Sequence, residues 1–150
     1  MKGNIKQIGD FFDRYTLLFN RALAGDADID GVTSAFAEHF IEASPAGVNA
    51  GSNTALFKEA VAGGLSFYRA MGIRSMEIQG KEITFLDDIH VLAKIKWRSS
   101  YSHEGAGAGT IEFVVFYLVQ DREGEKKIFA YITGDERKAL HALGLIPPSN

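Results

Sequence analysis

His39 is the residue in this sequence whose type best suits acid–base chemistry, because an imidazole titrates near neutral pH. Glu38 and Glu42 lie close to it in the sequence, and a neighbouring carboxylate can orient an imidazole ring for proton transfer. The alternative is a half-exposed surface histidine at the end of an amphipathic helix. Glu112 is a second candidate acid, because it shares one face of a predicted strand with apolar residues, and so points into a curved sheet or lies at its rim.

Two neighbouring carboxylates, Asp87 and Asp88, precede His90, and these residue types occur in metal sites. Aspartates are equally typical of hairpin turns, where the side chain accepts hydrogen bonds from the backbone. We expect the turn, and neither a metal nor a cofactor. Cysteine is absent from the sequence, which excludes disulfides, thiolate nucleophiles and cysteine-bound metals.

Any such site must be positioned by a sheet, which residues 74–133 are predicted to form. Val, Ile, Phe, Tyr and Trp dominate its extended segments, and Asp/Gly turns separate them. The glycine-rich segment 103–109 is predicted to be a loop, and a hairpin turn is expected at 122–125. The predicted strands cover residues 74–85 with a bulge at Gly80, 89–97, 110–119 and 127–133.

Helical periodicity is found in three segments before the sheet and in one after it. Residues 5–23 carry apolar side chains at intervals of three and four. A second helix is predicted over 28–43, beginning at Asp28 or Asp30, and a third is opened by one of the residues 52–54 and closed by Gly72. After the sheet, Asp135 is expected to cap a short helix that ends at Gly144.

Gly63 and Gly64 lie inside the third predicted helix, where each glycine costs about 1 kcal/mol relative to alanine. The favoured explanation is close packing of the helix against the sheet. The alternative is a ligand that approaches the helix backbone at this point.

The chain has 150 residues, which suits one domain spanning residues 1–150. With 46% hydrophobic and 23% charged residues, its composition is typical of a folded domain. The net charge of −3 disfavours nucleic acid as a partner. The first ten residues contain no apolar core of signal-peptide length, and no run in the chain reaches the roughly 18 apolar residues of a membrane span, so we expect a cytoplasmic location without membrane contact.

Several short segments near the N-terminus resemble a known family. They are Arg14-Tyr15, Ala24-Gly25-Asp26, Val32 with Ala35-Phe36-Ala37, and Ser44-Pro45-Ala46-Gly47. Together with the order of three helices followed by a sheet, they are similar to the opening of the nuclear transport factor 2-like superfamily, which includes SnoaL-like cyclases and ketosteroid isomerase. The resemblance implies an α+β, cystatin-like fold in which three N-terminal helices cover a cone-shaped, curved antiparallel sheet.

The resemblance also implies a mostly apolar pocket on the concave face, which would bind a small apolar or aromatic ligand. Tyr15 resembles the hydroxyl donor of ketosteroid isomerase; the alternative is a buried tyrosine bonded to the backbone. Ser44 stands where that enzyme has its base, and Val115 or Phe116 where it has its second acid, so steroid-type isomerisation is disfavoured. The implied lining is Tyr15, Phe19, Phe36, Phe40, Trp97, Tyr101, Val114 and Phe116.

Two functions stay open on this basis. The aromatic pocket, with Tyr15, His39 and Glu112 as candidate catalytic groups, favours a small-molecule enzyme of the SnoaL or isomerase type. The missing carboxylates favour a non-catalytic ligand-binding or protein-interaction domain.

The predicted strand at 110–119 is apolar on both faces, and the helices can cover one of them. Related domains commonly pair their sheets back to back, so a homodimer through the outer sheet face is expected. The alternative cover is the C-terminal helix, through Leu140, Leu143 and Leu145.

Overall fold

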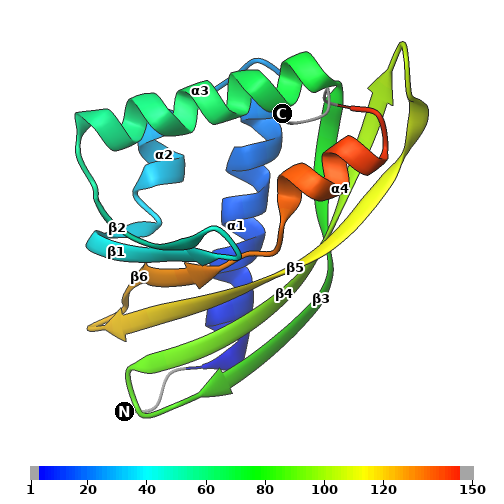
Figure 1. Cartoon of the computed structure of the whole chain (residues 1–150). Coiled ribbons are helices and arrows are strands. Elements are labelled where there is room, and N and C mark those ends of the chain that lie inside the picture. The colour runs from blue at the N-terminus through cyan, green and yellow to red at the C-terminus, as the bar shows by residue number, and fades with distance from the viewer. Residues whose placement is uncertain (1–3, 146–150) are drawn as a thin grey trace.

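The computed structural model describes residues 4–145, without the side chains of residues 136 and 137, as an α+β fold built on one sheet (Figure 1). The sheet has six strands in the order β2-β1-β6-β5-β4-β3, and all neighbours are antiparallel except β1 and β6. The predicted class, a curved sheet with helices at the N-terminus, is confirmed. The elements are α1 (Ile5–Leu23), α2 (Ile29–Thr33), β1 (Phe36–Ser44), β2 (Gly47–Ser52), α3 (Ala55–Met71), β3 (Ile73–Phe85), β4 (His90–His103), β5 (Gly107–Arg122), β6 (Glu125–Ile132) and α4 (Glu136–Ala142).

The long strands β3, β4 and β5 form the curved wall of the molecule (Figure 1). The predicted bulge in β3 is confirmed by a register shift between Ile78 and Gly80. β4 and β5 run further than predicted, which leaves only residues 104–106 as a turn. Gly109 of this segment lies within a strand. Tyr101 lies opposite it, and the Tyr101 ring occupies the space where a side chain at Gly109 would be.

The predicted second helix is wrong beyond Thr33. α2 ends there, and the chain continues as β1, which returns as β2 through a turn at residues 45–46. Phe36 and Phe40 are both buried, and a spacing of four residues places two side chains on the same side of a helix and of a strand alike. The apolar pattern therefore fits both structures. Pairing of β1 with β2 on one side and β6 on the other decides between them.

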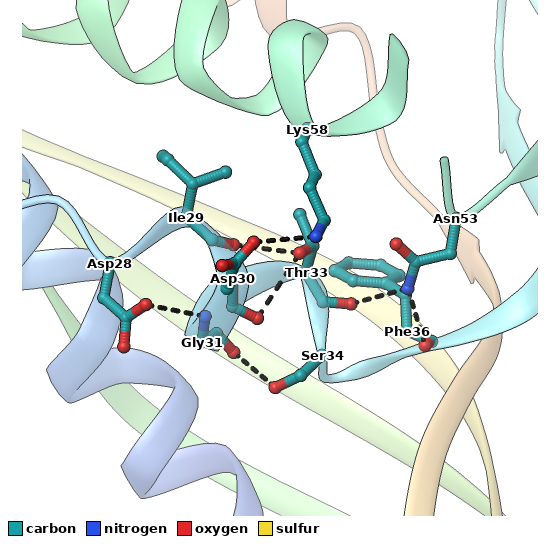
Figure 2. A network of polar contacts seen from close by, with 9 residues as sticks. All are labelled: Asp28, Ile29, Asp30, Gly31, Thr33, Ser34, Phe36, Asn53 and Lys58. Carbon is teal, nitrogen blue, oxygen red and sulfur yellow. Dashed lines mark hydrogen bonds and ion pairs between the residues drawn. The ribbon is translucent and has the colours of Figure 1, made fainter. Parts of the chain in front are cut away.

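Asn53 fixes the point at which α2 gives way to β1 (Figure 2). Its side-chain amide donates to the carbonyl oxygens of Thr33, at 2.9 Å, and Phe36, at 3.1 Å. Both acceptors belong to buried residues, whose carbonyls would be costly to leave without a partner. The Lys58 ammonium lies 2.7 Å from the Asp30 carboxylate and ties α3 to α2. These contacts place β1 and the first turns of α3 beside each other.

α1 packs along the inner face of the sheet. Ile8 and Phe12 are completely buried in the main core. The Asn20 side chain donates to the Met76 carbonyl and accepts from the Met76 N–H, each at 2.7 Å. Because this pair fixes the rotation of α1 about its axis, it also fixes the direction of Tyr15. No helix within residues 4–145 is long and apolar enough to cross a membrane.

The outer face of the sheet divides into a charged half and an apolar half. Over β3, β4 and β5, Lys94 lies 3.7 Å from Glu82 and Arg98 lies 3.2 Å from Glu112. The other half, which we call the apolar outer patch, lies over β1, β5 and β6. Its members follow from the strand register and are Ile41, Ala43, Val114, Phe116, Leu118, Ala130 and Ile132.

α4 lies on the inner side of the sheet, away from the apolar outer patch. Leu140 and Leu145 are buried in a cluster with Leu23 of α1 and Leu65 of α3. The alternative in which the C-terminal helix covers the outer face is therefore wrong. As predicted, Asp135 caps this helix, with its carboxylate accepting a 3.0 Å hydrogen bond from the backbone N–H three residues later.

Candidate functional site

A cavity of about 360 Å³ lies between the inner face of the sheet and the helices. This volume falls in the lower part of the range of small-molecule sites. The sheet contributes residues from β1, β3, β4, β5 and β6, and the helices contribute residues from α1, α2, α3 and α4. The side chains that matter below are Tyr15, Phe19, Phe36, Phe57, Val61, Leu65, Tyr68, Trp97, Phe113, Val115, Tyr117, Tyr131 and Asp135.

One stripe of α3 forms a wall of this cavity. Phe57, Val61, Gly64, Leu65 and Tyr68 all line it, and they follow one another at intervals of one, three and four residues. A helix repeats every 3.6 residues, so such positions share one face. α3 thus turns its apolar face to a cavity, which explains why only Leu65 and Met71 of this helix are fully buried.

Tyr15 supplies an unpaired hydroxyl to the cavity. Its ring packs 6.2 Å from that of Phe36 and 6.5 Å from that of Trp97, measured between ring centroids. No hydrogen bond joins its hydroxyl to another group in the described residues 4–145. Burial raises the pKa of Tyr15 to about 12, because the phenolate would be poorly solvated there. At neutral pH, Tyr15 is therefore a protonated donor.

Tyr117 and Trp97 form a second polar group in the cavity wall. The indole N–H of Trp97 donates to the Tyr117 hydroxyl over 3.2 Å. Burial raises the pKa of Tyr117 well above its ordinary value. The pKa of Tyr131, which also lines the cavity, is raised by burial and by the nearby charge of Glu42. All three phenols are therefore neutral at physiological pH.

Charged side chains are scarce around the cavity. Among the described residues that line it, none is lysine, arginine or histidine, and Asp135 is the single carboxylate. Asp135 is exposed, and one of its oxygens caps α4. The arrangement can donate hydrogen bonds inside an apolar space. Outside the lining, the exposed Glu42 carboxylate lies beside the Tyr131 phenol.

A model of the family described as "NTF2-like protein (DUF6841)" matches residues 6–136. The chain belongs to this NTF2-like family. The resemblance to the nuclear transport factor 2-like superfamily is thus confirmed. No significant match to a curated protein was found.

Solved structures share the NTF2-like fold at low sequence identity. An NTF-2 like protein of unknown function from Shewanella oneidensis is 17% identical with a TM-score of 0.62, over 87% of this chain and 98% of the other. A ketosteroid isomerase-like protein from Erwinia carotovora is 16% identical with a TM-score of 0.63, over 89% of this chain and 97% of the other. A putative polyketide cyclase from Xanthomonas campestris is 20% identical with a TM-score of 0.55, over 94% of this chain and 98% of the other. At such identity the likeness shows the fold alone.

The structure places four of the eight residues predicted to line the NTF2-like pocket on the cavity wall: Tyr15, Phe19, Phe36 and Trp97. Phe40 and Tyr101 are not part of the wall. Each of them lies across from a strand glycine and covers its backbone, Phe40 over Gly51 and Tyr101 over Gly109.

Val114, Phe116 and Glu112 lie on the outer face. The prediction that Val114 and Phe116 line the pocket is therefore wrong, and Glu112, expected to point into the curved sheet or to lie at its rim, does not point into it. Directly opposite residues of an antiparallel pair share a face. Trp97 lies opposite Phe113, which puts the odd-numbered residues of this part of β5 inside. Glu112 instead lies within 3.7 Å of Lys96 and 3.2 Å of Arg98, in the charged half of the outer face.

His39 is also outside the cavity. It belongs to β1 rather than to a helix, and its side chain is 77% exposed at an open groove of about 640 Å³. Its ring nitrogens lie 3.3 Å from the Ser52 hydroxyl and 3.8 Å from the Glu38 carboxylate. Glu42 lies in register with Tyr131. Of the three candidate catalytic residues, only Tyr15 reaches the cavity.

Asp87 serves the hairpin turn, as predicted. Its carboxylate accepts hydrogen bonds from the backbone N–H groups of Ile89 and His90, at 2.9 and 2.7 Å. A further contact of 2.8 Å joins it to the His90 ring, and these bonds, led by the one from the ring, lower the pKa of Asp87. Within the described part of the chain, no three potential metal ligands come together.

Sequence reasoning missed most of the cavity wall. Phe57, Val61, Leu65 and Tyr68 have helical spacing that could have identified them as one face. Tyr117 and Tyr131 carry no such signal, because their direction depends on how β5 pairs with β4 and β6.

Proposed function

We propose that the chain binds a small, neutral, largely apolar ligand in this cavity, and that Tyr15 donates a hydrogen bond to an acceptor oxygen of that ligand. The observation that carries the proposal is the Tyr15 hydroxyl, which faces an aromatic and aliphatic cavity and bonds to nothing else in residues 4–145. A carbonyl oxygen on the ligand would supply the acceptor that the described residues do not give to this hydroxyl. A hydrogen bond of this kind contributes about 0.5–1.5 kcal/mol.

The charges around the cavity favour a neutral ligand over an ion. An anion would need a cationic partner when it leaves water, and the described lining residues include no lysine, arginine or histidine. A cation would have only the exposed Asp135 to pair with. The protonated phenols of Tyr15 and Tyr117 favour an acceptor such as a ketone, ester or quinone oxygen.

Binding without acid–base catalysis is the function that this geometry favours. His39 and Glu112 lie outside the cavity, and Tyr15 holds its proton because its pKa is raised to about 12. Some solved structures with this fold carry names such as "putative scytalone dehydratase" or "putative polyketide cyclase". A reaction of that kind here would need a base, and Asp135 is the one carboxylate that the described lining offers.

The test is a fluorescence titration with prodan, a neutral naphthalene ketone whose emission responds to hydrogen bonds on its carbonyl. The wild-type chain should bind it and shift its emission. Tyr15→Phe keeps the ring and removes the donor, so prodan should bind about five- to tenfold more weakly. The analogue of the dye that lacks the carbonyl should bind both proteins equally. A wild-type chain that leaves prodan emission unchanged would contradict the proposal.

We also propose that the chain forms a homodimer through the apolar outer patch. Phe116 is 37% and Ile132 50% exposed there, and they lie in register on neighbouring strands. A second copy would bury this apolar surface, while the charged half of the outer face already pairs its own charges.

Light scattering should therefore report about twice 16.4 kDa for the wild-type chain at low micromolar concentration. Ile132→Asp should shift it to monomer or aggregate, because the new carboxylate would be buried between the apolar Phe116 and Ala43. Thr110→Asp is the matched control: it lies on the same outer face of the sheet, about 20 Å along β5 from Phe116, and should stay dimeric. A wild-type monomer at every accessible concentration would refute the dimer.

A further inference from the structure

We propose that Gly64 determines which ligands the cavity accepts, by leaving a notch in the α3 wall that receives a flat ring. This inference rests on the proposed ligand-binding function. It specifies which part of the ligand lies against α3. The ligand class is a neutral molecule with at least two fused rings and an acceptor oxygen, the ring system against Gly64 and the oxygen toward Tyr15.

The notch follows from the position of Gly64 on the cavity-facing stripe of α3. Val61, Leu65 and Tyr68 on the same stripe all carry large side chains, and Gly64 lies between them. A Cβ built on Gly64 would have no side chain or other packed atom within 4 Å. The explanation expected from the sequence, close packing of helix on sheet, is therefore wrong at this position. Space that a side chain could fill is open to the cavity.

Gly63 provides the comparison within the same helix turn. It is exposed and is not part of the cavity wall, and a Cβ there would also meet nothing within 4 Å. Both glycines weaken the helix to the same extent, because each lacks a side chain in a helix interior. Only at Gly64 does the missing side chain change the shape of the cavity.

The shape of the notch indicates what fits it. Bare helix backbone forms its floor, and the Tyr68 ring and the Val61 side chain lie one turn away on either side. A flat apolar ring can lie against such a floor without strain, whereas a branched chain would meet the neighbouring side chains. Ligands with one ring would be held at Tyr15 and leave the notch empty.

The experiment compares prodan, with two fused rings, and acetophenone, with one, in four variants of the full chain. Gly64→Ala, Gly64→Leu, Gly63→Ala and Gly63→Leu are each checked for folding by circular dichroism. Both alanine variants should raise the melting temperature by about 2–4 °C. Gly64→Leu should weaken prodan binding roughly tenfold or more and leave acetophenone binding within about twofold. Gly63→Leu should bind both ketones like the wild type.

Three results would overturn the notch. One is a folded Gly64→Leu variant that binds prodan as tightly as Gly63→Leu does. Another is an equal loss of affinity for both ketones in Gly64→Leu, since position 64 would then affect the whole cavity and not the notch alone. The third applies if Gly64→Leu does not fold, in which case Gly64→Ala is measured instead. A ratio of prodan affinity to acetophenone affinity equal to that of the wild type would then contradict the proposal. Failure of the wild-type chain to bind either ketone is a separate outcome, because it refutes the proposed function itself.

Discussion

Replacing Trp97 with alanine is expected to lower the free energy of unfolding by about 3–5 kcal/mol, the upper range for a buried aromatic residue. Trp97 is only 1% exposed and belongs to the main core. The space that it leaves would join the existing cavity, so neighbouring side chains could not collapse into it. The Tyr117 hydroxyl would also lose the indole N–H that donates to it. Since domains of this size have about 5–15 kcal/mol of stability, this single substitution would remove a large fraction of it.

Urea denaturation followed by far-ultraviolet circular dichroism measures this loss. Leu56→Ala is the matched control, because Leu56 is 76% exposed on α3 and its loss should change stability by no more than about 0.5 kcal/mol. Trp97→Phe should fall between the two, since it keeps a ring but removes the donor. A Trp97→Ala variant as stable as the control would mean that the core does not include this residue.

Raising the pH from 9 to 12 is expected to destabilise the fold through its buried tyrosines. The pKa of Tyr15 is about 12 in the folded chain, against an ordinary value of 10.0 in the unfolded one. Its contribution is fully present below pH 10 and is lost as the pH rises toward 12, because the unfolded state releases the proton first. The difference between these two pKa values corresponds to about 3 kcal/mol of stability in full, and about 2 kcal/mol of it is lost by pH 12, where half of the folded molecules still hold the proton. Burial also raises the pKa of Tyr117 and that of Tyr131, so their ionisation at high pH lowers the stability of the fold further.

The check is a set of denaturation curves at several pH values for the wild type and Tyr15→Phe. The variant should lose about 2 kcal/mol less stability between pH 9 and 12 than the wild type does. Phe67→Tyr is the control: Phe67 is 44% exposed, so a phenol there would ionise alike in both states and leave the pH dependence unchanged. Identical pH dependence in wild type and Tyr15→Phe would show that Tyr15 is solvated in the folded chain.

The family, the α+β class and most elements were predictable from the sequence, because they depend on local patterns. Helical spacing in 5–23 and 55–71 and β-branched or aromatic runs in 74–133 each indicate an element without reference to the rest of the chain. The second predicted helix failed for a related reason. The spacing of Phe36 and Phe40 fits both a helix and a strand. The two strands that pair with β1 come later in the chain: β2 follows it directly, and β6 lies far along the sequence.

The residues of the candidate site were predictable only on an amphipathic helix, or on a strand with one apolar and one polar face. Tyr15 and Phe19 lie on the apolar side of α1, and Trp97 alternates with charged residues on β4, so their directions follow from the sequence. β5 is apolar on both faces, so a shift of one residue would exchange Phe113, Val115 and Tyr117 for Val114, Phe116 and Leu118 without any change in apolar pattern. The pairing of Trp97 with Phe113 makes that choice, and it is a contact between strands. Local sequence thus determined which segments are strands and helices, whereas tertiary pairing decided which side chains face the cavity, because the side-chain direction of a two-sided apolar strand is set by its neighbours.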